Sequence, residues 1–161
     1  MSFENLKPLV SSILTKENTT RDEKLLAVCQ LLTDSIDYYN WVGYYFANHE
    51  TKTLHLGPYV GAETDHTVIP FGKGICGQVA VSNENFVVAD VHSQDNYIAC
   101  NIDVKSEIVI PLFLNDTNIG QIDIDSNTAN AFDKSDVHLL EHVNELISDH
   151  MTSNNISINI S

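Results

Sequence analysis

The chain has 161 residues, and its 22 acidic side chains outnumber the 8 basic ones to give a formal net charge of −14. This charge repels phosphate groups, so nucleic acids and anionic membrane surfaces are excluded as general partners, whereas small cationic or zwitterionic ligands are favoured. Hydrophobic residues make up 43% of the sequence and charged residues only 19%, a composition that supports a folded core and excludes disorder throughout.

No apolar run approaches the ~18–20 residues that a bilayer-spanning helix needs, and the first residues lack the basic and apolar regions of a signal peptide. We therefore expect a cytoplasmic protein with no membrane partner. The cysteines at 29, 76 and 100 are too few, and odd in number, for a disulfide framework. Each cysteine needs its own explanation as a core residue, a ligand or a reactive thiol.

Hydrophobic periodicity predicts the elements of the first half of the chain. Apolar residues recur at helical spacing over 3–14, and a stronger stripe that includes Cys29 runs from Leu25 to Ile36. Strands are then expected at 41–46 and 53–60, joined as a hairpin, followed by a short extended piece at 67–70 and a glycine-rich turn (72–77) that opens a short helix around 78–81.

The second half predicts a strand at 86–90, a long polar loop at 92–105 of the kind that is usually functional, and a hairpin of strands 107–114 and 119–125. Asp133 caps a final helix. These elements predict one α+β domain over 1–151, with a central mixed or antiparallel sheet and the N- and C-terminal helices packed on one face. Residues 152–161 form a tail that we expect to be disordered.

Two short motifs suggest chemistry, but their surroundings favour plainer interpretations. The segment GKGICG (72–77) matches the G-x-G-x-x-G pattern of dinucleotide-binding folds, which requires a preceding strand and a long following helix. A proline-interrupted piece precedes it and the expected helix is short, so we interpret it as a tight turn with positive φ. The segment HLLEH matches a zinc-protease pattern, yet His138 and His142 fall on the polar face of the last helix, where surface chelation is the most we expect.

The cysteines differ in their surroundings. Cys29 lies on the apolar stripe of its helix and is expected to be an inert hydrophobic residue. Cys76 lies in the glycine turn at a helix N-terminus, where partial positive charge favours a thiolate. Cys100 lies in the long polar loop. From the residues alone, these last two could be unrelated loop cysteines.

Three acidic residues are predicted to converge at the second hairpin. Asp123 and Asp125 are two apart on a strand and so point to one face, while the isoleucines beside them point to the other, and Glu107 opens the neighbouring strand. Such acids can simply form a solvent face; desolvated together, they would share protons and raise at least one pKa, so that a carboxylic acid could donate a proton at neutral pH. Trp41 and Tyr45 share one side of the first strand, as core residues or as the wall of a pocket.

Several motifs, taken in order, resemble the free methionine-(R)-sulfoxide reductases, small cytosolic enzymes with a GAF fold. The resemblance runs from about residue 20 to 150. The motifs are NWVGYY (40–45), LGPY (56–59), GKGICG (72–77), VADVH (88–92), IAC (98–100), SEIVIPL (106–112) and IGQIDIDS (119–126).

The resemblance implies roles for the candidate residues. Cys100 matches the family's catalytic nucleophile, whose thiolate attacks the sulfoxide sulfur, releases methionine and becomes a sulfenic acid; a second thiol then forms a disulfide that thioredoxin or a similar dithiol reduces. The family's acids match Glu107, Asp123 and Asp125 and bind the sulfoxide oxygen and the ammonium of the free amino acid. Its aromatic residues match Trp41 and Tyr45, which would enclose the substrate side chain. The resemblance requires no cofactor and no metal, and a homodimer is compatible with it.

One position departs from the family pattern. Many members carry a third cysteine, commonly the resolving thiol, four residues before the proline of the extended piece, and this chain has His66 there. Cys76 then resolves, or an external thiol reduces Cys100 directly. A competing interpretation is a non-catalytic GAF module that binds a small ligand without efficient turnover.

Overall fold

The computed structural model of the chain describes residues 3–94 and 103–153. Its elements, apart from short 3-10 turns at Phe3–Asn5 and Val91–Ser93, are α1 (Leu6–Thr15), α2 (Arg21–Ser35), β1 (Trp41–Asn48), β2 (Thr53–Val60), β3 (Val68–Pro70), α3 (Gly74–Ser82), β4 (Phe86–Val88), β5 (Ser106–Leu114), β6 (Thr117–Ser126) and α4 (Lys134–Ser153). These elements confirm the predicted α+β class, and the tail beyond Ser153 lies outside the described residues.

The six strands form one sheet in the order β3-β2-β1-β6-β5-β4, and every neighbouring pair in it is antiparallel. The centre is made by β1 and β6, which pair with Trp41 opposite Asp125 and Gly43 opposite Asp123. On the other side of β6, Glu107 of β5 lies opposite the same Asp125. This register brings the candidate acids of two strands to one place in the sheet.

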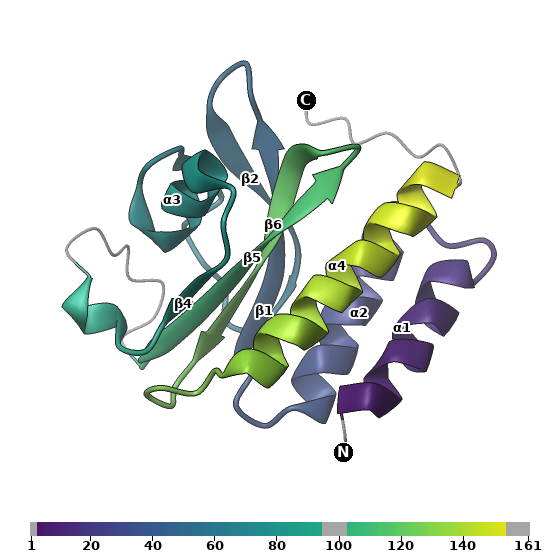
Figure 1. Ribbon diagram of the computed structural model, residues 1–161, viewed down its shortest axis with the longest axis horizontal. Helices are drawn as coiled ribbons and strands as arrows, with labels where there is room; N and C mark the ends of the chain where they lie inside the picture. Colours follow the sequence, from purple (N-terminus) through teal and green to yellow (C-terminus); the bar gives the residue numbers. More distant parts are fainter. Residues whose placement is uncertain (1–2, 95–102, 154–161) are drawn as a thin grey trace.

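Helices cover the two faces of the sheet unequally. The helices α1, α2 and α4 lie side by side on one face, while α3 lies on the other (Figure 1). The helix-side core contains Ile122 and Ile124 together with the stripe of α2, as predicted, and Cys29 of that stripe is fully buried. Each such buried aliphatic side chain contributes ~1.5–3 kcal/mol, so the core under the three helices stabilises the sheet that carries the opposite face.

Polar side chains cap the N-termini of α2 and α4, and the cap of α4 is the one that the sequence predicts. Thr20 and Glu23 form a reciprocal capping box at the start of α2. Asp133 caps α4, since its Oδ1 accepts a hydrogen bond of 2.8 Å from the backbone N–H of Ser135. Asp133 N–H in turn donates to buried Asp136 Oδ2 at 2.9 Å, which closes the first turn of the helix.

The glycine-rich segment is a tight turn, as interpreted, but the helix after it begins earlier than expected. Gly72 and Gly74 have φ of +88° and +64°, a backbone region that glycine enters without strain. The helix α3 then starts at Gly74 rather than near residue 78, because only these two positions require positive φ. An added Cβ on Gly77 would lie 2.6 Å from Pro70 O, so this glycine allows the first turn of α3 to dock against the preceding segment.

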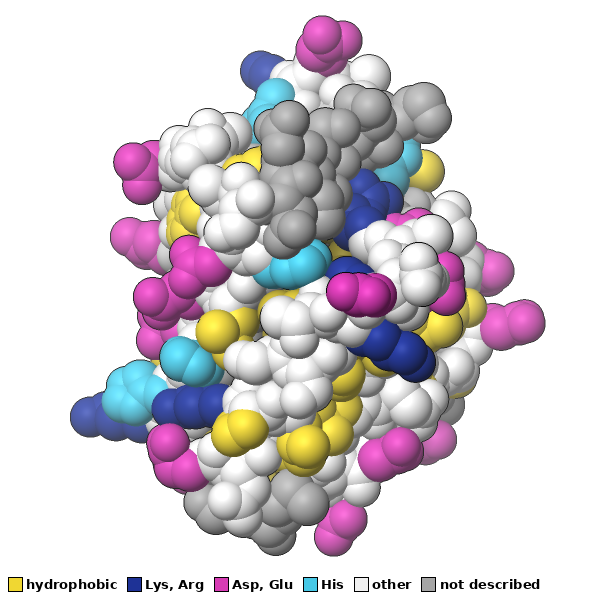
Figure 2. All heavy atoms as spheres, turned by 90° about the vertical axis from the view of Figure 1, so that its right-hand side faces the viewer, with side chains coloured by type: hydrophobic (Ala, Val, Ile, Leu, Met, Phe, Trp, Pro, Cys, Tyr) yellow, Lys and Arg dark blue, Asp and Glu magenta, His cyan; other side chains and the backbone are white. Residues whose placement is uncertain are grey.

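Acidic side chains are scattered over the helical side of the molecule, with several lysine and arginine side chains among them (Figure 2). The excess of negative charge is therefore spread over this side and does not form one patch. Among the described residues, no helix combines the length and the apolar character needed to traverse a bilayer.

Candidate active site

Three carboxyl side chains lie buried under α3, on the face of the sheet opposite the three long helices. Alternation along β6 points Asp123 and Asp125 toward this face, and the hairpin register adds Glu107 from β5. Their exposed fractions are 2%, 3% and 5%, respectively. The predicted convergence of these acids is confirmed, and they form a desolvated row instead of a solvent face.

Cys76 joins the acid row from the first turn of α3. Its Sγ lies 3.8 Å from Glu107 Oε2, and Sγ and one oxygen each of Glu107 and Asp123 all lie within 4.8 Å of one another. The backbone carbonyl of Cys76 accepts a hydrogen bond of 3.1 Å from Gln121 Nε2, which ties this turn of the helix to β6. The thiol is only 5% exposed, so it lies inside the protein and not on an open loop.

Burial and mutual repulsion control the protonation of this cluster. Desolvation raises the pKa of Asp123, and it raises that of Asp125 well above the usual range with help from the charge on Asp123; hydrogen bonds with Glu107 act in the opposite direction. A hydrogen bond between two carboxyl groups requires a proton on one of them, so this arrangement favours a protonated carboxyl group within the row.

The thiolate expected at Cys76 is not favoured. Desolvation is the largest cause that raises the pKa of the Cys76 thiol well above its usual range, and the charges of Asp123 and Glu107 add to it. The positive field of a helix N-terminus is worth only ~0.3–1 kcal/mol, which is smaller than the penalty for a thiolate buried beside carboxylates. The prediction of a stabilised thiolate at this position was therefore wrong, and Cys76 rests as a neutral thiol.

Two acid oxygens in the row have no hydrogen-bond partner among the described residues. They are Oδ1 of Asp123 and Oδ1 of Asp125. A buried acceptor without a partner costs ~1–3 kcal/mol. Such oxygens indicate a place where a donor or a cation binds.

Aromatic side chains wall the row on the β1 side. Trp41 stacks on Tyr45 and on Tyr59, with ring centroids 6.4 Å and 5.3 Å apart. Trp41 Nε1 donates to Ala62 O at 3.0 Å, and Tyr45 OH donates to His66 O at 2.9 Å. Both rings are thus fixed at their polar ends, and the two predicted wall residues lie on the same face as the acids.

Small cavities open on the two ends of the row. One of about 60 Å³ is lined by Trp41, Val104 and Asp125 with neighbouring polar residues. The other, of about 20 Å³, is lined by Tyr45, His66, Cys76, Glu107 and Asp123 together with nearby residues. The position that departs from the family pattern, His66, therefore shares a cavity with Cys76.

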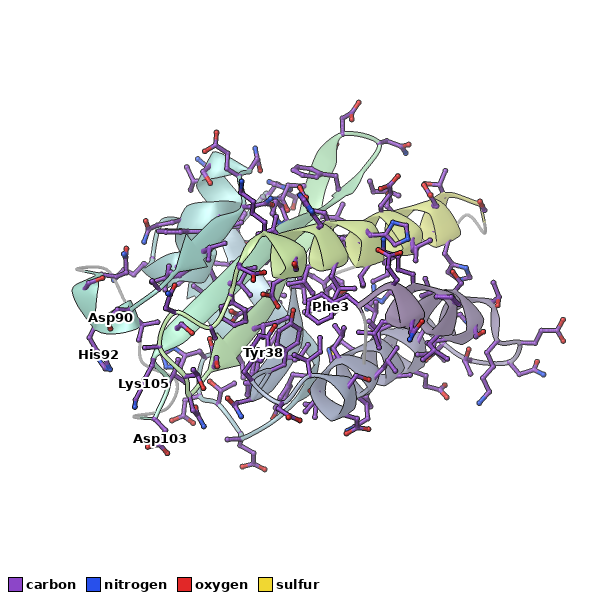
Figure 3. All side chains as sticks on the ribbon, turned by 60° about the horizontal axis from the view of Figure 1, so that its bottom comes forward. Phe3, Tyr38, Asp90, His92, Asp103 and Lys105 are labelled. Atoms are coloured by element: carbon purple, nitrogen blue, oxygen red, sulfur yellow. The ribbon has the colours of Figure 1, made fainter. Side chains whose placement is uncertain are left out.

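Cys100 lies outside the described residues. The segments on either side of 95–102 lie at the same end of the molecule, where Asp90 and His92 face Asp103 and Lys105 (Figure 3). A hydrogen bond of 2.8 Å from Val91 N–H to Lys105 O joins these segments. Val104, which follows Cys100 by four residues, lines the cavity at Asp125.

Sequence reasoning missed Gln121, which is fully buried and whose Oε1 has no partner among the described residues. It lies two residues before Asp123 on β6, so the same alternation that paired the acids could have included it. His138 and His142, in contrast, lie on α4 and are not part of the one group of three potential metal ligands found in the described ranges, which is Cys76, Glu107 and Asp123.

Comparison with known proteins agrees with this architecture. Residues 18–152 match the family model of the GAF domain. A free methionine-R-sulfoxide reductase from Saccharomyces cerevisiae is 41% identical over 111 residues, which cover 68% of this chain and 61% of the yeast protein, so the match spans less than two thirds of that relative.

Solved structures extend the comparison over nearly the whole chain. The free methionine-R-sulfoxide reductase (fRMsr) of Staphylococcus aureus, solved in its reduced form, matches with a TM-score of 0.85 and 36% identity. The match covers 92% of this chain and 94% of that one. The free methionine-R-sulfoxide reductase of Neisseria meningitidis, solved in complex with its substrate, has a TM-score of 0.88 and 29% identity, covering 97% and 92%. The chain belongs to the GAF-domain family of free methionine-R-sulfoxide reductases.

Proposed function

We propose that this protein reduces free L-methionine-(R)-sulfoxide to L-methionine, with Cys100 as the nucleophile. The observation that carries the proposal is the buried row of Glu107, Asp123 and Asp125, with two oxygens that lack partners among the described residues. Relatives that are named as free methionine-R-sulfoxide reductases support it.

The acid row suits a ligand with an ammonium group. The unpartnered oxygens of Asp123 and Asp125 would accept hydrogen bonds from the α-ammonium of a free amino acid, and charge-assisted bonds of this kind are about twice as strong as neutral ones. A methionine residue within a peptide has no ammonium there, so the row selects the free amino acid. The stacked rings of Trp41 and Tyr45 would cover its apolar side chain.

The same row can supply the proton that the reaction needs. When the Cys100 thiolate attacks the sulfoxide sulfur, a carboxylic acid donates a proton to the S–O oxygen and makes the sulfur electrophilic. The S–O bond then breaks and its oxygen passes to the cysteine sulfur. The sulfoxide sulfur gains two electrons and leaves as methionine, while the cysteine sulfur loses two and becomes a sulfenic acid. The raised pKa of Asp123 and of Asp125 supports a proton donor at neutral pH.

We assign the second thiol to Cys76. Its sulfur would attack the sulfenic acid, a water molecule would leave, and the resulting disulfide would be reduced by a thioredoxin-type dithiol, which itself becomes a disulfide. A carboxylate oxygen of Glu107, which lies 3.8 Å from Cys76 Sγ, would take the thiol proton.

The decisive experiment couples turnover to thioredoxin and NADPH, with L-methionine-(R)-sulfoxide as substrate. We expect NADPH oxidation in the parent protein, none in Cys100→Ala and no loss in Cys29→Ala, which removes a thiol from the opposite core. Cys76→Ala should release one equivalent of methionine per chain and then stop with thioredoxin. His66→Cys, which restores the family's usual thiol, should accelerate thioredoxin-dependent turnover.

An absence of turnover with both thioredoxin and dithiothreitol would contradict the proposal. In that case binding of the sulfoxide, detected as protection of Cys100 from alkylation, would leave the non-catalytic ligand module as the function.

A further inference from the structure

We infer that the cluster of Cys76, Glu107 and Asp123 is a binding site for one zinc ion, and that zinc binding competes with the amino-acid ligand. The regulatory half of this inference rests on the proposed function, whereas the metal site itself stands on the geometry below.

The ligand types favour zinc over the hard cations. A thiol sulfur combined with carboxylate oxygens selects borderline metals such as Zn²⁺, while Mg²⁺ and Ca²⁺ prefer oxygen ligands alone. Glu107 and Asp123 offer one oxygen each and Cys76 offers its sulfur. Three protein ligands with one open position are a common zinc arrangement.

The spacing is close to that of a metal centre. With Zn–S near 2.3 Å and Zn–O near 2.0 Å, ligand atoms on one tetrahedral ion lie roughly 3.3–3.5 Å apart. Here Cys76 Sγ lies 3.8 Å from Glu107 Oε2, and all three ligand atoms lie within 4.8 Å of one another. Side-chain shifts of less than ~1 Å would complete the site, and the helix turn that carries Cys76 is already held by Gln121.

A second observation points to a cation. The buried Oδ1 of Asp123 has no partner among the described residues, although it lies in a low-dielectric chamber where an unpartnered oxygen is costly. The open coordination position would face the cavity that Asp123 shares with His66. Lys73 also lines this cavity, but its side chain is exposed and its charge is therefore screened by solvent.

Occupation by zinc would block the proposed reaction at two points. The ion would hold the sulfur of Cys76, which is then unable to resolve a sulfenic acid, and it would neutralise Asp123, one of the two aspartates proposed to receive the ammonium. The ammonium group of the amino acid and the metal ion are both positively charged and would occupy the same row, so they should exclude each other.

The test uses cobalt as the probe on the full-length, reduced, chelator-treated protein. Cobalt bound to a thiolate gives a charge-transfer band in the near ultraviolet, and this band should saturate at one equivalent per chain and disappear when zinc is added. Cys76→Ser should abolish the band, and Asp123→Asn, which keeps the thiol, should weaken cobalt binding at least tenfold. L-Methionine should also weaken the apparent affinity of the parent protein.

Matched variants separate this site from others. Cys29→Ser and the double variant His138→Ala/His142→Ala should keep the band, because those residues lie elsewhere in the fold. The inference is overturned if the parent protein shows no band, if the band persists in Cys76→Ser, or if the histidine pair alone removes it. If Cys76→Ser does not fold, an unchanged cobalt affinity in Asp123→Asn overturns the inference.

Because the band needs no turnover, the two proposals fail separately. A protein that shows the band but reduces no sulfoxide supports the metal site and contradicts the proposed function. A protein that turns over but shows no band supports the function and contradicts the metal site.

Discussion

Asp125→Asn is expected to stabilise the protein and at the same time to remove its ability to bind methionine. Asp125 is 3% exposed, its Oδ1 has no partner among the described residues, and its burial beside Asp123 raises its pKa. The isosteric amide keeps the shape, removes the negative charge and adds N–H donors that can pair with a neighbouring carboxyl oxygen such as Oδ1 of Asp123. Relief of about 2 kcal/mol follows from the typical penalty of a buried unpaired group, which for a chain of this size raises the melting temperature by about 6 °C.

Ligand binding should reverse the order of the two melting temperatures, so that the parent protein melts above Asp125→Asn. At one hundred times its dissociation constant, a ligand that binds only the folded state stabilises it by ~2.7 kcal/mol, or roughly 8 °C by the same scaling. We expect this shift in the parent protein with L-methionine and little of it in Asp125→Asn, since the ammonium loses its carboxylate partner.

The assay is differential scanning fluorimetry at pH 7.5 with a chelator present. The matched control is Asp37→Asn, the same substitution at an exposed position, which should change neither the melting temperature nor the ligand shift. N-Acetyl-L-methionine, which lacks the ammonium, should not shift the parent protein. A lower melting temperature for unliganded Asp125→Asn, together with an undiminished methionine shift, would refute the reasoning.

Three further outcomes follow from the same structure. The folded-state pKa values of Asp123 and Asp125 are raised above the ordinary Asp value, so the folded protein binds more protons than the unfolded chain. Chelator-treated protein should therefore become more stable in urea titrations as pH falls from 8 toward 5. This gain in stability should be smaller in Asp123→Asn and in Asp125→Asn. Gly77→Ala places a Cβ 2.6 Å from Pro70 O, so we expect a loss of ~1–3 kcal/mol in urea unfolding and slower turnover as the first turn of α3 shifts. Cys29→Ala should lose ~1–2 kcal/mol through a small core cavity and keep its turnover number, because that thiol lies on the helix side of the sheet; a large fall in turnover would contradict its inert role.

The sequence predicted the acid row because strand geometry is strict. Alternation assigns Asp123 and Asp125 to one face whatever else the chain does, and a short hairpin loop places Glu107 opposite Asp125. The aromatic pair Trp41 and Tyr45 follows from the same rule. These predictions needed only local periodicity, which the folded structure keeps.

The environment of Cys76 could not be predicted in the same way. Its protonation depends on how deeply α3 docks over the sheet, and that docking is set by tertiary contacts such as the approach of Gly77 to Pro70 and the hydrogen bond from Gln121. Sequence reasoning weighed the helix N-terminus alone, because the opposing carboxyl groups lie 31 and 47 positions further along the chain, at Glu107 and Asp123. A local effect below ~1 kcal/mol was then outweighed by desolvation.

The buried acids connect the stability of this protein to its chemistry. Three carboxyl groups in one dry chamber destabilise the empty fold, and the three-helix layer on the opposite face offsets that penalty through apolar packing. The same unpaired oxygens give a cation its partners, so a ligand that brings positive charge gains both the contacts and the relief of repulsion. A substitution that relieves the empty site must therefore weaken the liganded one, because both effects arise from the same oxygen atoms.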